Sequence, residues 1–217
     1  MFNLIENIQS QKFDFQLITR DFYERANVTQ IARELLGKYL FSFIDNVMTA
    51  GMIVETEAYC GENDKACHAF NGLTSRTQVM FGEAGHAYVY LCYGIHQMFN
   101  VVTNVRGKAD AVLIRSIQPV FGVEEMLKRR KKTKLNSSLT SGPGCVAQAL
   151  GIHFKQHHGT DLLGNTIWIM ENKATKIPDD QIFETIRIGV EYAGESALLP
   201  WRFYIKDNEH VSRKVKN

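Results

Sequence analysis

One segment of alternating character, AGMIVETEAY at residues 50–59, most constrains how this chain can fold. Its β-branched, aromatic and apolar residues predict a β-strand. Because successive side chains of a strand point to opposite faces, we expect Glu55, Glu57 and Tyr59 on one face, where Ile53 precedes them. Unpaired carboxylates are costly to bury, so this cannot be an ordinary core face. The face is either hydrated or part of a functional site.

The remaining segments predict an α+β fold with an antiparallel or mixed sheet, because strands follow one another before helices interleave. The predicted strands are residues 38–45, 50–59, 86–93, 99–105, 110–117, 166–170, 187–192 and 202–207. The predicted helices are residues 27–37, 121–132 and 143–151. Asn27 is expected to cap the first helix, and Gly37 to close it. A chain of 217 residues without repeats or a Pro- or Ser-rich linker favours a single domain over residues 1–217.

Several classes of function lack support in the sequence. No run approaches the ~18 apolar residues of a membrane helix, and residues 1–16 lack the features of a signal peptide, so we expect a cytoplasmic protein. The absence of GxGxxG and P-loop patterns gives no support for a nucleotide cofactor. Cys67 beside His68 is a weak indication of metal binding, since no second ligand pair follows. Reduced thiols are expected at Cys60, Cys67, Cys92 and Cys145.

A basic run, KRRKKTK at residues 128–134, carries six cations in seven residues, although the net charge of the chain is only +2. One interpretation is a solvated helix end whose cations complement the helix dipole. The other is a patch that contacts phosphates. The run alone does not decide between them.

Three further features are chemically unusual. Tyr93 precedes Gly94 at an expected hairpin bend, where an aromatic ring can stack on or wedge between bases. Arg115 interrupts an apolar strand, so it lies either at a hydrated edge or buried against a carboxylate, for which Glu55 and Glu57 are candidates. The sequence SGPG at residues 141–144 begins a helix, either as a site for an anion at free amide groups or as a plain capped start.

Five segments in order resemble the alkyladenine (3-methyladenine) DNA glycosylases, purine-specific enzymes of alkylation repair. They are GMIVETEAYCGENDKACHAF, MFGEAGHAYVYLCYGIHQMFNVV, AVLIRSIQP, SGPGCVAQALGI and RIGVEYAGE followed by PWRFYIKDNEHVS. The resemblance extends from about residue 18 to residue 213, which leaves residues 1–17 as an N-terminal extension. Its most specific element is ETEAY, followed nine residues after Tyr59 by His68 and then by YVYLCYG.

The resemblance implies one compact α+β domain with a curved, mainly antiparallel sheet, flanking helices and a protruding hairpin. It implies hydrolysis of the N-glycosidic bond of damaged purines in double-stranded DNA, as the first step of base excision repair, by a monomer without metal or cofactor. Such an enzyme is expected on cytoplasmic, nucleoid-associated DNA in a bacterium, or in the nucleus of a eukaryote.

The resemblance also implies a role for each matching position. Glu57 is the expected general base that activates water, and Arg115 and the main-chain carbonyl of Ile188 help to hold that water. The expected walls of the base pocket are Tyr59, His68 and Tyr90, and Asn100 is the steric gate against the exocyclic amine of guanine. Tyr93 is the expected wedge that replaces the flipped nucleotide, and Arg76 contacts the DNA backbone.

Physical chemistry supports this set of roles. A glycosidic bond inside a duplex is out of reach, so the nucleotide must be extruded at a cost of a few kcal/mol. A pocket of tyrosine and histidine attracts a positively charged alkylated purine. A glutamate can stabilise the oxocarbenium-like sugar and activate water, and a nearby arginine favours its ionised form. Because the pocket motifs contain no lysine for a Schiff base, we expect a monofunctional enzyme.

Two other interpretations remain at this point. A glycoside hydrolase would use Glu55 and Glu57 as an acid and base pair, although residues two apart on a strand lie roughly 6.7 Å apart and parallel, whereas such enzymes flank the bond from opposing sides. A non-catalytic nucleic-acid-binding module would use Tyr93 and the basic run, and Glu57 would then be structural.

Overall fold

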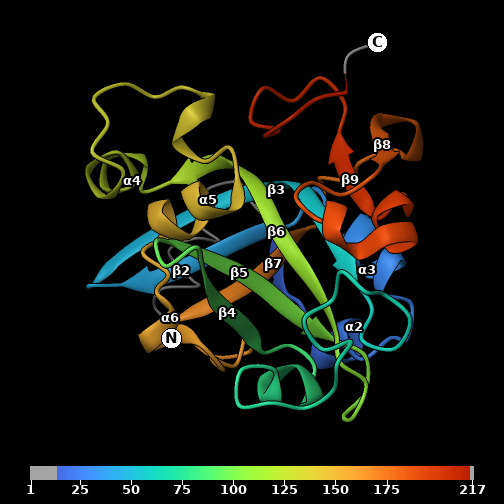
Figure 1. The fold of residues 1–217 in the computed structure, drawn as a ribbon. Helices are drawn as coiled ribbons and strands as arrows, with labels where there is room; N and C mark the ends of the chain where they lie inside the picture. Colours follow the sequence, from blue (N-terminus) through green and yellow to red (C-terminus); the bar gives the residue numbers. More distant parts are fainter. Residues whose placement is uncertain (1–13, 216–217) are drawn as a thin grey trace.

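Two long antiparallel strands, β3 (Val47–Tyr59) and β6 (Asp110–Phe121), form the centre of the sheet in the computed structural model (Figure 1). The structure describes residues 14–215, and within them the sheet has nine strands in the order β1-β7-β2-β3-β6-β5-β4, with β9 joined to β3 and β8 to β9. All these pairings are antiparallel. This arrangement confirms the predicted α+β class with its antiparallel sheet.

The other strands are β1 (Phe15–Leu17), β2 (Tyr39–Ile44), β4 (Ala87–Cys92), β5 (His96–Thr103), β7 (Ile167–Asn172), β8 (Ile182–Thr185) and β9 (Arg202–Ile205). The α-helices are α2 (Arg20–Tyr23), α3 (Val28–Glu34), α4 (Val123–Arg129), α5 (Pro143–Leu150) and α6 (Phe154–His157). Four 3-10 helices are η1 (Gln78–Phe81), η2 (Ser137–Leu139), η3 (Asp179–Gln181) and η4 (Glu191–Leu198).

Along one of its two edges, strand β3 pairs with a different strand at each end. Residues 47–52 pair with β2, whereas residues 55–57 pair with β9, and β6 runs along the other side of the strand. The second half of β3 is therefore enclosed by β6 and β9, which bring Arg115 and Arg202 beside the two glutamates. Branching of the sheet at this point places the charged residues of three strands together.

Irregular pairing between β3 and β6 alters the expected alternation. The register shifts between Ile53 and Glu55, and again between Glu55 and Thr56, where the paired residue on β6 moves from Ser116 to Ile114. Ile53 and its neighbour Val54 both belong to the main core cluster, so the prediction that Ile53 shares the face of the glutamates stays a prediction. A bulge inserts an unpaired residue and re-aims the side chains beyond it, and such bulges are frequent next to active sites.

Helix α3 packs on the back of this strand. Asn27 caps it by accepting a hydrogen bond from the backbone N of Gln30, as the sequence predicted. Val28 and Ile31 are buried against the main core, and Thr56 of β3 donates to the carbonyl of Ala32 at 2.8 Å. The helix thus fixes the face of β3 opposite to the one that carries the glutamates.

The predicted strand at residues 187–192 is wrong. After β8 the chain turns at Gly189, whose φ of +77° lies in the left-handed region, and η4 begins at Glu191. The backbone N–H of Ile188 is bonded to the side chain of Glu57 and not to a neighbouring strand. The alternation of apolar residues at 187–192 therefore does not indicate a strand in this segment.

Of the proposed N-terminal extension, residues 1–13 lie outside the described residues. Phe15–Leu17 form β1, which pairs with β7, and the ring of Phe15 packs edge-on against Tyr39 and Phe41. The end of that extension is thus part of the sheet. Among the residues that the structure describes, no helix has the length and apolar character needed to cross a membrane.

The cap of α3 gives a first prediction. Asn27→Ala should lower the free energy of unfolding by about 1 kcal/mol, because the amide of Gln30 loses its acceptor. Chemical denaturation would measure the change. Asn27→Ser is the matched control, since serine supplies an acceptor at the same position; equal losses in both variants would contradict the capping role.

Candidate active site

Glu55 is fully buried in β3 and accepts five hydrogen bonds from described residues. The Nε atoms of Arg115 and Arg202 donate to Oε1 at 3.1 and 2.7 Å, and Oγ of Ser116 donates to Oε2 at 2.8 Å. Ser212 donates from its backbone N to Oε2 at 2.7 Å and from Oγ to Oε1 at 2.9 Å. Burial raises the pKa of Glu55, but the two guanidinium groups and Ser212 outweigh it and hold the pKa below its ordinary value.

Glu57 is also fully buried but accepts three hydrogen bonds from described residues. Oε2 accepts from the hydroxyl of Tyr59 at 2.8 Å and from Nη1 of Arg115 at 3.1 Å. Oε1 accepts from the backbone N of Ile188 at 2.7 Å. Arg115 therefore bridges the two glutamates. The sequence left open whether Arg115 lies at a hydrated edge or is buried against a carboxylate, and the structure shows that it is buried. Glu57 keeps one acceptor position that none of these three donors fills.

The phenol of Tyr59 acts as a donor to Glu57. Burial and the neighbouring carboxylate of Glu57 raise the pKa of Tyr59 well above its ordinary value, so the hydroxyl stays protonated. The guanidinium of Arg187 lies over the Tyr59 ring, 4.8 Å from its centroid. Tyr59 is thus held at its hydroxyl and across its ring.

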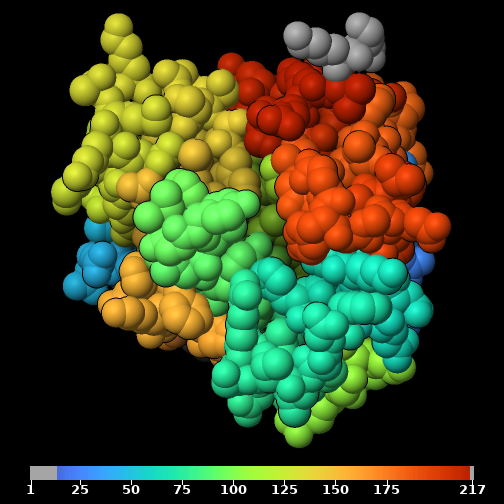
Figure 2. Space-filling model, in the orientation of Figure 1, coloured from blue at the N-terminus to red at the C-terminus, as the bar shows by residue number. Residues whose placement is uncertain are grey.

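A pocket of about 240 Å³ lies between the β4–β5 hairpin, β6 and the segment that follows β8. Tyr59, Arg115 and Ile188, the three residues that donate to Glu57, all line it. Its other walls include Cys67, His68, Met80, Tyr88, Tyr90, Met98, Asn100, Leu113 and Tyr192. In Figure 2 the surface is hollowed between the green segment of the β4–β5 hairpin and the orange segment that follows β8. The pocket is therefore aromatic, with an ionisable carboxylate behind its wall.

His68 and Tyr90 meet at one wall of the pocket, with ring centroids 4.6 Å apart in an edge-to-face arrangement. Nδ1 of His68 shares a hydrogen bond of 2.9 Å with the hydroxyl of Tyr88. Burial and the adjacent guanidinium of Arg76 lower the pKa of His68 to about 4. His68 is consequently neutral at neutral pH.

Asn100 is buried on β5 at the floor of the same pocket. Its Nδ2 donates to the carbonyl of Tyr88 at 3.0 Å and, more weakly, to that of Met98 at 3.5 Å. The amide group is therefore fixed in orientation by two backbone carbonyls.

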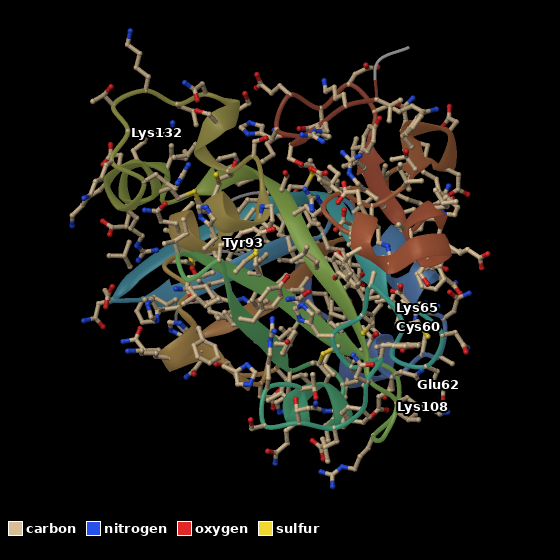
Figure 3. The ribbon with its side chains drawn as sticks, viewed as in Figure 1. Cys60, Glu62, Lys65, Tyr93, Lys108 and Lys132 are labelled. Carbon is tan, nitrogen blue, oxygen red and sulfur yellow. The ribbon has the colours of Figure 1, made fainter. Side chains whose placement is uncertain are left out.

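Tyr93 projects from the tip of the hairpin between β4 and β5, as the sequence predicted (Figure 3). Its side chain is 92% exposed, and its φ of +49° is uncommon for a residue other than glycine. Ile95, also in the turn, is 71% exposed. An apolar tip that is exposed at the rim of a pocket indicates a surface that becomes covered in use.

Arg76 lies at the pocket rim, with its guanidinium 5.1 Å from the centroid of the Tyr90 ring. Its Nη2 is 3.4 Å from both ring nitrogens of His68. The predicted contact of Arg76 with a DNA backbone is not tested by this arrangement, in which the side chain packs on the pocket wall.

The basic run divides into two kinds of residue. Arg129 is mostly buried, pairs with Glu125 and donates to the carbonyl of Ile44, and Arg130 donates to the carbonyl of Leu139. Lys128 and Lys132 extend outward, and Lys132 reaches Ser138 at 2.9 Å. Two of the six cations are therefore structural, and the predicted phosphate contact stays a prediction for the others.

Sequence reasoning missed Arg202 and Ser212, which complete the shell of Glu55, and Arg187 with Asp64. One signal was present in the sequence. Two buried carboxylates need more than one cation, so a second arginine was required beside Arg115. Arg187 and Arg202 were both candidates, and their spacing in the sequence did not indicate that Arg202 is the one that pairs with Glu55 on β3.

Comparison with known proteins gives a consistent result. The family model of methylpurine-DNA glycosylase (MPG) matches residues 21–209. A protein of Methanocella arvoryzae is 45% identical over 200 residues, which cover 92% of this chain and 97% of that protein. A protein of Alkaliphilus oremlandii is 42% identical over 205 residues (91% and 99%), and one of Carboxydothermus hydrogenoformans is 45% identical over 198 residues (91% and 100%). Each of the three carries the provisional name 3-methyladenine DNA glycosylase.

The shell of Glu55 predicts how stability depends on pH. Because the pKa of Glu55 is lowered in the folded protein, its stabilisation is fully present above the ordinary glutamate pKa of about 4.3 and is lost as the pH falls through the folded value. Glu55→Gln should lower the free energy of unfolding by about 3 kcal/mol at pH 7, and the difference from wild type should shrink between pH 5 and pH 3 (about this range). Chemical denaturation at several pH values would measure it.

Glu195→Gln, a change at an exposed glutamate of η4, is the control. It should leave both the stability and its pH dependence close to wild type. A constant difference between Glu55→Gln and wild type across the pH range would contradict the proposed ionisation of Glu55.

Proposed function

The chain belongs to the methylpurine-DNA glycosylase family, and we propose that it flips damaged purines out of duplex DNA and hydrolyses their N-glycosidic bond with a water activated by Glu57. It is an enzyme of the DNA glycosylase type, a hydrolase of N-glycosyl bonds. The names of its relatives point to 3-methyladenine among the substrates. Its partner is double-stranded DNA, which it acts on as a monomer and without a cofactor.

One observation carries the proposal, namely the carboxylate of Glu57 behind the wall of an aromatic pocket with one acceptor position left over. Arg115, Tyr59 and Ile188 donate to it and fix its orientation. A water in the pocket would fill the fourth position. The carbonyl of Ile188 is the further contact proposed for that water, since the N–H of the same residue is already bound to Glu57.

The reaction follows from this placement. As the bond between the base nitrogen and C1′ breaks, its electron pair leaves with the base, and positive charge develops on the sugar. The Glu57 carboxylate stabilises that charge and accepts a proton from the water while the water oxygen bonds to C1′. Arg115 stays paired with both glutamates throughout and keeps Glu57 oriented toward the water.

The pocket walls suit a planar, electron-poor base. Tyr59, His68 and Tyr90 offer aromatic surfaces, and an alkylated purine with positive charge gains cation–π attraction from the tyrosines. The neutral state of His68 avoids repulsion of such a base. Asn100, whose amide is fixed by two backbone carbonyls, is proposed to exclude the exocyclic amine of an undamaged guanine.

Tyr93 is proposed to occupy the space that the flipped nucleotide leaves in the stack. Its exposed ring stands at the pocket rim, where an extruded nucleotide would pass. Arg76 is proposed to contact the DNA backbone next to this nucleotide, which requires its guanidinium to leave the Tyr90 ring.

The central test is single-turnover release of base from duplex oligonucleotides that contain 3-methyladenine, hypoxanthine or ethenoadenine. Wild type should release at least one of these bases. Glu57→Gln should lower the rate by at least about 100-fold, because the base and the charge are removed together, while binding to the same duplex is retained. Binding of lesion duplex by wild type without release would contradict the proposal and indicate a non-catalytic binding module.

The wedge gives a separate prediction. Tyr93→Ala should weaken affinity for lesion-containing duplex by about 1 to 3 kcal/mol, the value of one aromatic stack. Fluorescence anisotropy with matched lesion and undamaged duplexes would measure the loss. Val105→Ala, which trims an exposed apolar residue in the turn between β5 and β6, is the control. Unchanged lesion affinity in Tyr93→Ala would exclude the wedge role.

A further inference from the structure

A second buried ion pair lies next to the pocket, between Arg187 and Asp64. Both side chains are fully buried. Nη2 of Arg187 donates to Oδ1 of Asp64 at 2.8 Å, and Nη1 donates to Oδ2, so the pairing is bidentate. Arg187 immediately precedes Ile188, whose N–H is bound to Glu57. Neither residue of this pair lines the pocket.

The pair joins three segments of the chain. Arg187 donates to the carbonyl of Ala58 on β3 at 2.9 Å and to that of Ser196 on η4 at 2.8 Å. Asp64 accepts from the backbone N of Ala66 at 3.0 Å, in the loop that carries His68. The ion pair thus holds that loop and the segment after β8 against the end of β3.

Arg187 also supports the ring that donates to Glu57. Its guanidinium lies over two aromatic rings, 4.8 Å from the centroid of Tyr59 and 5.2 Å from that of Trp201. A guanidinium can pair with a carboxylate in one plane and stack on rings above and below it, which the ammonium of a lysine cannot do. Arg187 therefore contacts the ring of Tyr59 through its guanidinium, and it is joined to Ile188 by a peptide bond.

Two of the three donors to Glu57 consequently depend on Arg187, whereas the third, Arg115, is held separately by Glu55. A buried ion pair is weak evidence for stability, because desolvation of the charges offsets their attraction. Its geometry beside Glu57 is more informative. We propose that the Arg187–Asp64 pair is a positioning element that holds the Tyr59 hydroxyl and the Ile188 N–H on Glu57. This inference rests on the proposed function.

Loss of the pair should leave Glu57 less precisely oriented. Removing Arg187 and Asp64 together leaves the net charge near Glu57 unchanged but loosens two donors to its carboxylate. The rate of base release should therefore fall, because the reacting groups are less well positioned. The affinity for a lesion duplex should be largely kept, because the pocket walls remain in place.

The experiment uses the double variant Arg187→Gln, Asp64→Asn, which removes both charges without a large change in volume. Single-turnover base release from a lesion duplex would be measured with saturating enzyme at neutral pH, and affinity for the same duplex by fluorescence anisotropy. We expect the rate of base release to fall about tenfold. Affinity for the lesion duplex should change less than about threefold, because the wall residues stay in place.

Two controls keep the inference falsifiable. Arg20→Gln with Asp161→Asn removes an ion pair between α2 and the chain before β7, outside the pocket, and should leave both the rate of base release and the affinity for the lesion duplex unchanged. Arg187→Lys keeps the positive charge but loses the bidentate pairing and the stacking on aromatic rings. Its rate of base release should lie between those of wild type and the double variant. Arg187→Lys also serves as the test if the double variant does not fold.

The outcomes separate the two claims. A folded double variant, or Arg187→Lys in its place, with the wild-type rate of base release overturns the positioning role. A loss of rate that is matched by an equal loss of affinity for the lesion duplex overturns it too. Absence of base release by wild type on every lesion overturns the proposed function instead.

Discussion

The shared guanidinium of Arg115 is the interaction on which the site depends. It bridges Glu55 and Glu57 in a region where both carboxylates are fully buried, and Arg202 adds the second cation. Two buried anions without these partners would be strongly destabilising. To bring the partners together, β6, β9 and the segment around Ser212 must all meet on one half of β3. The branch in the sheet therefore brings together the cations and hydrogen-bond donors that the two buried carboxylates require.

Two identical residues on one strand thereby acquire different properties. Glu55 accepts five hydrogen bonds, so its carboxylate is saturated, and its pKa is lowered. Glu57 accepts three and adjoins the pocket through its donors. A glycoside hydrolase that used both as an acid and base pair would need one carboxylic acid with a raised pKa. Glu55 is the opposite case, which argues against that interpretation.

The sequence predicted the parts of this arrangement that local pattern controls. Alternation and composition located β3, the bend at Gly94 placed Tyr93 at an exposed tip, and an arginine in an apolar strand had the glutamates as candidate partners. It could not predict the register shift beside Glu55, because a bulge depends on the partner strand. The prediction of a strand at residues 187–192 was wrong for a related reason. Its apolar alternation fits a strand, but the N–H of Ile188 is used by a side chain distant in sequence.

The double role of Arg115 also limits what its removal can reveal. The role of Arg115 in holding the water suggests that Arg115→Ala should slow turnover more than it weakens DNA binding. In this structure the same change leaves Glu55 with Arg202 as its cation and removes the arginine donor of Glu57, so the fold is destabilised along with the chemistry. Loss of activity in that variant would therefore not separate catalysis from folding. Glu57→Gln keeps an acceptor oxygen at that position and leaves Arg115 paired with Glu55. Glu57 is therefore the residue at which the chemical question can be asked with the least change to the fold.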